Sequence, residues 1–162
     1  MLPLTEKQLQ NSFINASQRE VKNIVYPDLA DVAWDRLDYL GWRDRKVPGI
    51  GYVVIELDGI PTGILLRQTD SKTRSRAQCS WCEDVTLPND VVLFGAKRSG
   101  PAGRNGNTVG TLICDEFQCS TNVRKLPPVA YLGFDVEAAR LQRIENLQSR
   151  ADRFVRDIRD GR

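Results

Sequence analysis

The clearest hydrophobic pattern along the chain is a pair of β-branched and aromatic runs on either side of a two-residue turn. Residues 51–57 form the first run, Asp58-Gly59 follows it, and residues 60–67 form the second run. Two such runs around Asp-Gly predict a β-hairpin. Further runs at residues 91–97 and 109–113 predict two more strands.

The first part of the chain has helical spacing instead. Apolar positions three and four residues apart predict short helices over residues 6–16, 18–25 and 29–40, the last of them ending at Gly41. Thr5-x-x-Gln8 has the form of a capping box at the start of the first helix. We therefore expect a small helical layer before the strands.

The tail predicts one long helix. Asp135 is suited to the N-cap, and no Gly or Pro follows until Gly161. One apolar stripe runs along this helix at Ile144, Leu147, Ala151, Phe154 and Ile158. This pattern leaves two interpretations open: the stripe packs against its own domain, or it binds a partner or a second copy.

Length and composition indicate a single domain. The chain has 162 residues, of which 41% are hydrophobic and 27% are charged, as in an average globular protein. We divide it into a helical part (1–46), a β-rich core (47–134) and a C-terminal helix (135–162). No apolar run reaches the roughly 20 residues needed to span a bilayer, and the N-terminus lacks the pattern of a signal peptide, so we expect a cytoplasmic protein.

The absence of histidine restricts the chemistry. The chain has none, which excludes Ser-His-Asp and Cys-His nucleophile arrangements, histidine zinc ligands and histidine proton relays. The formal net charge is +2, and four thiolates around one Zn²⁺ would bring it close to zero. Nucleic-acid binding through charge alone is therefore poorly supported.

Four cysteines carry the strongest chemical signal. Cys79 and Cys82 have a C-x2-C spacing, and Cys114 and Cys119 have a C-x4-C spacing. Two close pairs separated by strands are typical of a tetrahedral four-thiolate zinc site. The alternatives are a redox pair or unrelated buried thiols, and the matched pairs and the lack of a thioredoxin-like βαβ pattern argue against both.

The order of these elements predicts the fold. A C-x2-C turn, a β-hairpin and a helix that begins at Cys119 form a treble clef, and the whole chain is then an α+β protein of antiparallel hairpins with a helical layer and a long C-terminal helix. A four-cysteine site is closed, so one Zn²⁺ would be structural and contribute folding energy.

Other candidate sites have simpler explanations. Gly49-x-Gly51 precedes a strand and predicts a turn, and glycines at 100, 103 and 106 predict a flexible loop, because neither group completes a nucleotide-binding motif. The carboxylates of Asp84, Asp90 and Asp115-Glu116 show no acid–base pairing, and we expect them on the surface. We therefore predict that the protein is not an enzyme.

Three segments together resemble a known family. They are Arg76-Ala-Gln-Cys-Ser-Trp-Cys82, Val92-Leu-Phe-Gly-Ala-Lys-Arg98 and Gly106-Asn-Thr-Val-Gly-Thr-Leu-Ile-Cys-Asp-Glu-Phe-Gln-Cys-Ser-Thr-Asn-Val-Arg124. They resemble the C-terminal treble-clef zinc-finger domain of the elongation factor G-binding proteins, which include fusidic-acid-resistance proteins. The resemblance implies the same four zinc ligands, and it implies a partner, elongation factor G, whose release from the ribosome the resistance proteins promote.

A protein-binding surface of this kind would use aromatic and arginine anchors. Our candidates are Arg98, Arg104, Phe117 and Arg124, with a place in the core as the alternative for Phe117. Trp81 is either packed over the zinc site or an exposed anchor.

A different class of partner, ribosomal RNA, is the second hypothesis. It would use the basic side chains Arg74, Arg76, Lys97, Arg98 and Arg104.

Overall fold

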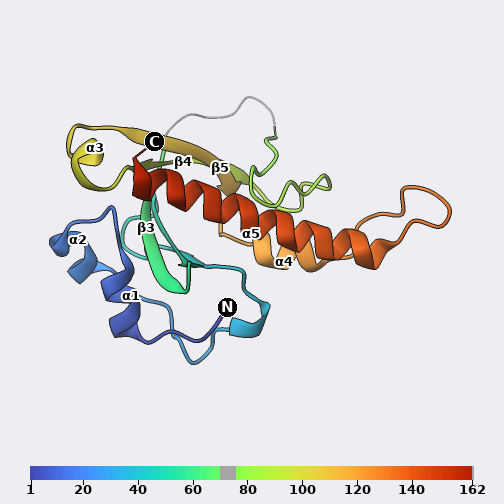
Figure 1. Cartoon of the computed structure of the whole chain (residues 1–162), viewed down its shortest axis with the longest axis horizontal. Coiled ribbons are helices and arrows are strands. Elements are labelled where there is room, and N and C mark those ends of the chain that lie inside the picture. Colours follow the sequence, from blue (N-terminus) through green and yellow to red (C-terminus); the bar gives the residue numbers. More distant parts are fainter. Residues whose placement is uncertain (70–75, 162) are drawn as a thin grey trace.

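The structure is a computed structural model that describes residues 1–69 and 76–161. Its centre is an antiparallel sheet of five strands in the order β1-β2-β3-β4-β5 (Figure 1). The strands are β1 (Leu40–Arg43), β2 (Ile50–Leu57), β3 (Ile60–Gln68), β4 (Val91–Lys97) and β5 (Thr108–Cys114). The α+β class is confirmed.

The predicted β2–β3 hairpin is confirmed with its turn. Leu57 pairs with Ile60 across Asp58 and Gly59. Both turn residues have positive φ, 55° and 76°, which is the conformation that a two-residue hairpin turn requires. The two strands then pair over their whole length.

An asparagine side chain joins β3 to β4 where the two strands separate. Their ladder contains only the pairs Arg67–Gly95 and Gln68–Phe94. Beyond it, the Asn15 amide donates to the carbonyls of Leu65 and Lys97, both at 3.0 Å, and accepts from the Leu65 N–H at 2.8 Å. One side chain thus replaces part of the missing ladder.

The N-terminal part is less helical than predicted. Helices α1 (Glu6–Ser12) and α2 (Gln18–Asn23) form, each with a complete capping box. The predicted helix over residues 29–40 is wrong: this segment contains only a 3₁₀ turn, η1 (Trp34–Arg36), before β1 begins at Leu40.

Tertiary packing explains this difference. Leu29, Val32, Trp34 and Leu37 all pack against the cluster formed by Leu9, Leu40 and Val54. An irregular chain of turns, bends and one 3₁₀ turn buries these side chains, and helical spacing along the sequence does not distinguish that arrangement from a helix.

The long C-terminal helix, α5 (Val136–Asp160), begins at an Asp135 N-cap whose side chain accepts from the Ala138 N–H at 2.9 Å. It packs against its own sheet, which decides between the two interpretations of its stripe. Its fully buried side chains are Leu147, Ala151, Val155 and Ile158, while Ile144 and Phe154 are half-buried at the margin.

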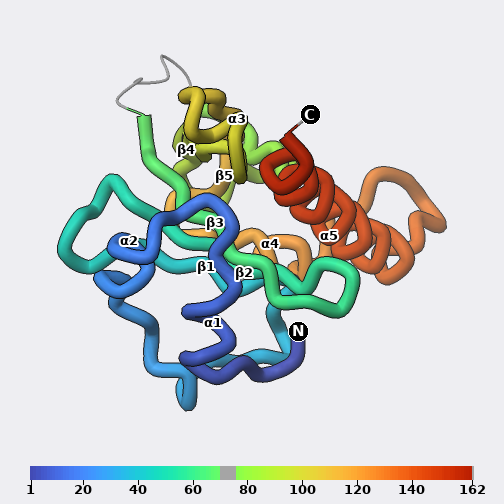
Figure 2. The backbone as a smooth tube through the Cα atoms, turned by 60° about the vertical axis from the view of Figure 1, so that its left-hand side comes forward, coloured from blue at the N-terminus to red at the C-terminus, as the bar shows by residue number. Residues whose placement is uncertain are grey.

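The sheet is covered on both faces. Val53 and Ile55 belong to the cluster that contains α5, whereas Val54 between them contacts Leu9 of α1. Figure 2 shows α5 and α1 on different sides of the strands. Burial on both faces explains why residues 51–55 read as a continuous apolar run.

The glycine-rich loop between β4 and β5 is partly helical, contrary to the prediction. It contains α3 (Gly100–Arg104). Gly103 lies so close to the Arg98 carbonyl that a Cβ would come within 1.8 Å of its oxygen, so this glycine permits the tight turn. In the described part of the chain, no helix is both long and apolar enough to cross a membrane.

Candidate metal centre

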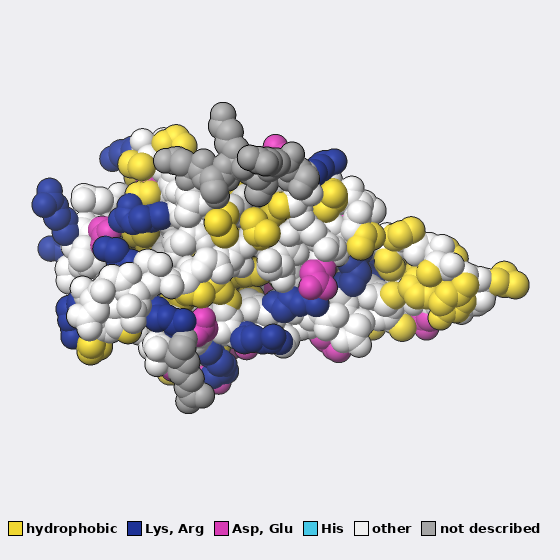
Figure 3. Space-filling view, turned by 90° about the horizontal axis from the view of Figure 1, so that it is seen from above, with side chains coloured by type: hydrophobic (Ala, Val, Ile, Leu, Met, Phe, Trp, Pro, Cys, Tyr) yellow, Lys and Arg dark blue, Asp and Glu magenta, His cyan; other side chains and the backbone are white. Residues whose placement is uncertain are grey.

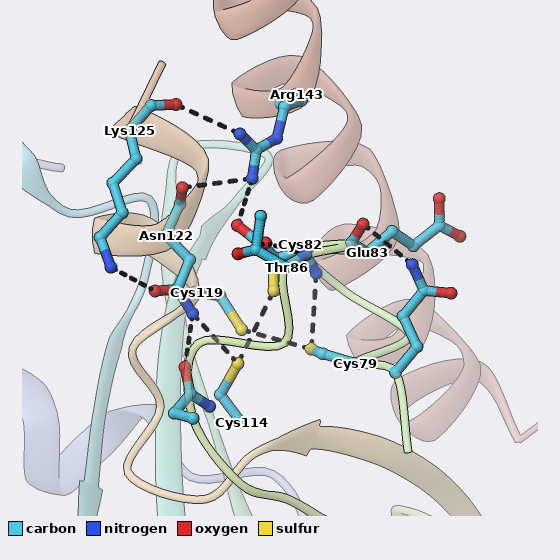
Figure 4. A network of polar contacts seen from close by, with 12 residues as sticks. Cys79, Cys82, Glu83, Thr86, Cys114, Cys119, Asn122, Lys125 and Arg143 are labelled. Carbon is cyan, nitrogen blue, oxygen red and sulfur yellow. Dashed lines mark hydrogen bonds and ion pairs between the residues drawn. The ribbon is translucent and has the colours of Figure 1, made fainter. Parts of the chain in front are cut away.

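Three separate segments bring the four cysteines together. Cys79 and Cys82 lie in the turn that precedes β4, Cys114 ends β5, and Cys119 is the first residue of α4 (Cys119–Arg124). All four are buried, and their sulfur atoms lie within 4.8 Å of one another (Figure 4).

The distances fit one tetrahedral zinc ion. Four sulfurs at about 2.3 Å from one Zn²⁺ are separated from each other by about 3.8 Å. The Sγ–Sγ distance is 3.6 Å for Cys79–Cys119 and 3.6 Å for Cys82–Cys114. The four cysteines are therefore positioned to bind a single metal ion, consistent with one structural zinc.

Backbone and amide donors surround the sulfurs. The N–H groups of Trp81 and Cys82 point at Cys79 Sγ, at 3.4 and 3.5 Å. The side-chain amide of Asn122 donates to Cys114 Sγ at 3.5 Å and also to Asn89 Oδ1 at 2.7 Å. Donors of this kind orient thiolate ligands and offset their charge.

The thiols differ in how readily they ionise. Hydrogen bonds from the neighbouring thiols, that of Cys114 first, hold the pKa of Cys79 below its usual value. Burial raises the pKa of the Cys119 thiol. A bound divalent cation would supply the charge that stabilises all four as thiolates.

Two left-handed residues shape the turns around the site. Glu83, directly after Cys82, has φ 46°, and Phe117, between the second pair, has φ 58°. The N–H of Glu83 bonds to the Cys79 carbonyl and that of Phe117 to the Cys114 carbonyl. Glycine usually fills such positions, so the residue types gave no sign of the left-handed conformation at Glu83 and Phe117.

Phe117 belongs to the core. Its side chain is 6% exposed and stacks on Phe94 with 5.4 Å between ring centroids. The ring fills space that Gly41 and Gly51 leave open, since a Cβ on either glycine would come within 2.6 Å of it. Gly51 lies in β2, as the predicted strand has it, and Gly49 lies in the turn before it. Phe117 is not a surface anchor.

Trp81 also packs inside the protein, which decides between its two interpretations. It is 1% exposed and makes edge contacts with Tyr39 at 5.2 Å. Its indole N–H donates to Thr111 Oγ1 at 3.0 Å.

The candidate partner-binding arginines lie apart on the surface. Arg98 pairs with Asp157 at 2.8 Å, and Arg124 pairs with the buried Asp38 at 2.5 Å. Arg104 is exposed on α3, and within residues 1–69 and 76–161 no ion pair involves it. Arg74 lies outside the described residues.

A polar network that the sequence did not reveal connects the centre to α5. Asp84, expected on the surface, is 6% exposed. Arg143 of α5 donates to it at 2.6 Å and to the carbonyls of Asn122 and Lys125 at 3.2 Å each (Figure 4). Because Arg143 and Asp84 are 59 positions apart, no local pattern could pair them. Asp115 likewise pairs with Arg43.

Comparison with known proteins identifies the family. The model of the FBP C-terminal treble-clef zinc-finger family matches residues 8–158. The chain belongs to this family. The match includes all four cysteines and nearly all of the sheet and α5, in agreement with the sequence resemblance.

A solved structure supports the same assignment. The chain is similar to the structure of the fusidic acid resistance protein FusC, with a TM-score of 0.56 and 25% sequence identity over 75% of this chain. The similarity covers 53% of that protein, so this chain corresponds to about half of it. No curated protein matches the sequence.

Proposed function

We propose that this FBP-family chain is a zinc-stabilised protein-binding module that binds elongation factor G and modulates its release from the ribosome. The observation that carries the proposal is the family match over residues 8–158, together with the similarity to a fusidic acid resistance protein. The module has no enzymatic activity, because four cysteines around one ion leave no coordination position for water or substrate. It acts in the cytoplasm, where reducing conditions keep the thiols available for metal.

An exposed apolar arm supports a protein partner. The arm is the segment 126–134 between α4 and α5, which projects from the body of the molecule (Figure 1). Its exposed large side chains are Leu126, Val129, Tyr131 and Leu132. Figure 3 shows hydrophobic side chains gathered at this projecting end. Contiguous apolar surface of this kind is characteristic of protein interaction sites.

The arrangement of basic groups gives less support to RNA binding. Arg98 is held by Asp157, which leaves Arg76, Lys97 and Arg104 as the exposed candidates among the described residues. A phosphate-binding surface requires several free cations on one face.

The test is a titration of the zinc-loaded protein with elongation factor G from the same organism at two salt concentrations. We expect stoichiometric binding at micromolar concentration or tighter at both. The combined variant Tyr131→Ser/Leu132→Ser should weaken binding at least tenfold. Ile60→Ser is the control, because Ile60 is as exposed as Tyr131 but lies at the start of β3, outside the arm.

Two results would contradict the proposal. One is the absence of binding to elongation factor G by the folded, zinc-loaded protein. The other is binding to ribosomal RNA whose affinity falls with salt at a log–log slope near −0.7 to −0.9 per contacted phosphate, which would favour the RNA hypothesis.

A further inference from the structure

Strand β5 has a free edge. In the part of the chain that the structure describes, β5 pairs with a strand, β4, on one side only. The carbonyl of Leu112 accepts from the Ser80 N–H, which lies on the other side. Because alternate residues of an antiparallel strand point their backbone groups to opposite sides, Thr108 and Gly110 face outward with Leu112. Within the described residues, no hydrogen bond reaches the backbone N–H or carbonyl of Thr108 or Gly110, or the Leu112 N–H.

An open groove of about 550 Å³ runs beside this edge, between β5 and α5. Phe154 is the half-exposed ring of the groove floor, and it packs on the buried ring of Trp81 with 5.7 Å between the ring centroids. Ser80 and Thr111 line the strand side, and arginines of α5 line the other. Figure 3 shows hydrophobic side chains in the middle of the molecule with basic and acidic side chains beside them.

The charges around the groove leave one cation without a partner. Arg150 pairs with Glu83 at 2.6 Å, and Arg156 pairs with Asp58 at 2.6 Å. The two groove carboxylates, Asp157 and Asp160, are paired with Arg98 and Arg159. Arg153 lines the groove and is exposed, and in the part of the chain that the structure describes no ion pair involves it. The groove thus carries one uncompensated positive charge beside an aromatic floor.

We propose that this edge and groove bind an extended segment of a protein partner as a sixth strand, and that the segment carries an acidic residue two positions from a large apolar one. The outward N–H and carbonyl groups of Thr108 and Gly110 would supply main-chain hydrogen bonds up to the point where Ser80 occupies the Leu112 carbonyl, as in other strand-addition complexes. Side chains two residues apart on a strand point to the same face about 7 Å apart. An apolar side chain then covers Phe154 while the carboxylate two positions away reaches Arg153.

This site is independent of the proposed elongation factor partner. It shares no residue with the arm or with the four cysteines. Failure of either proposal therefore leaves the other standing, and each is measured with a different probe.

The probe is a fluorescein-labelled, capped peptide Thr-Glu-Thr-Phe-Thr-Glu-Thr. Its Glu residues lie two positions on either side of Phe, so it presents the same pattern whether it binds parallel or antiparallel to β5. We expect saturable binding by fluorescence polarisation and slower hydrogen exchange at the Thr108 and Gly110 amides. Replacing both Glu by Gln should weaken binding at least tenfold.

Matched variants of the zinc-loaded protein separate the contribution of the β5 edge from that of the Arg153 charge. Gly110→Pro removes an edge N–H that the β4 ladder does not use, and it should abolish binding. Gly110→Ala should retain it, because a Cβ there meets only ordinary contacts, the nearest at 3.5 Å. Arg153→Glu should weaken binding at least tenfold, whereas Arg140→Glu, on α5 outside the groove, should not.

Three results would overturn the inference. They are no saturable binding by wild-type protein at millimolar concentration, binding that neither Gly110→Pro nor Arg153→Glu affects, and a wild-type dimer that Gly110→Pro converts to monomer. The last would assign the edge to a second copy of the chain.

Discussion

At the scale of single residues, Asp44 is a buried carboxylate held by three donors. Its side chain accepts from the Lys46 and Val47 N–H groups at 2.8 and 2.9 Å and from the Tyr52 hydroxyl at 2.6 Å. Burial raises the pKa of Asp44, but the Tyr52 hydroxyl and the two amides outweigh burial, and its pKa lies below the usual value. The bonds therefore stabilise the ionised form in the folded state.

The lowered pKa of Asp44 predicts a pH-dependent loss of stability. A carboxylate with a depressed folded-state pKa contributes stability above its unfolded pKa of about 3.9 and loses it as pH falls through the folded value. Asp44→Asn should lower the free energy of unfolding by about 1–3 kcal/mol at pH 7. The deficit should shrink at pH values of about 3 and below. Urea unfolding of the wild type and of Asp44→Asn at both pH values measures this difference in the free energy of unfolding. Asp31→Asn, at an exposed position, is the control.

Gly51 provides a second test at the scale of single residues, because its lack of a side chain leaves room for the Phe117 ring. Gly51→Ala places a Cβ 2.5 Å from Phe117 Cζ, whereas nothing lies within 4 Å of a Cβ at Gly49. We expect Gly51→Ala to lower the free energy of unfolding by about 1–3 kcal/mol through overpacking. Gly49→Ala should leave it nearly unchanged. Equal effects of both substitutions in chemical denaturation would contradict the placement of Phe117.

At the scale of elements, α5 joins the sheet through a narrow buried stripe. Leu147 is fully buried, whereas Leu141, two turns earlier, is 54% exposed. Leu147→Ala should lower the free energy of unfolding by about 2–5 kcal/mol, because it opens a cavity between α5 and the sheet. Leu141→Ala should lower the free energy of unfolding much less. Thermal unfolding of the two variants measures the difference, and a similar effect of both would show that α5 does not dock as described.

At the scale of the whole molecule, the metal site and the core form one unit. All four cysteines belong to the same hydrophobic cluster as β2, β3 and α5. Cys114→Ser, or removal of zinc with a chelator, should therefore lower the melting temperature of the entire chain in a single transition. Thermal melting followed by circular dichroism, together with metal analysis, tests this. Ser80→Ala, in the turn between Cys79 and Cys82, is the control. Full metal content and wild-type melting of Cys114→Ser would refute the ligand assignment.

Contacts across the whole molecule also explain which predictions from the sequence were correct and which were not. The β2–β3 hairpin, the strands β4 and β5, the cysteine site and the Asp135 cap all depend on residues close together in the chain, or on a chemical group with one dominant use. The 29–40 helix was wrong because its apolar spacing fits more than one backbone, and contact with Leu9 and Val54 selects a chain of turns and bends.

The sequence by itself determined the α+β class, the four-thiolate site and the amphipathic character of the C-terminal helix. These follow from periodicity and ligand spacing, which are local properties. Only the tertiary structure decided that Phe117 and Trp81 are buried, that Asp84 meets Arg143, and that β5 keeps a free edge beside an aromatic groove. Each of these depends on contacts between residues far apart in the chain, and burial and charge pairing are determined only when the whole chain has packed.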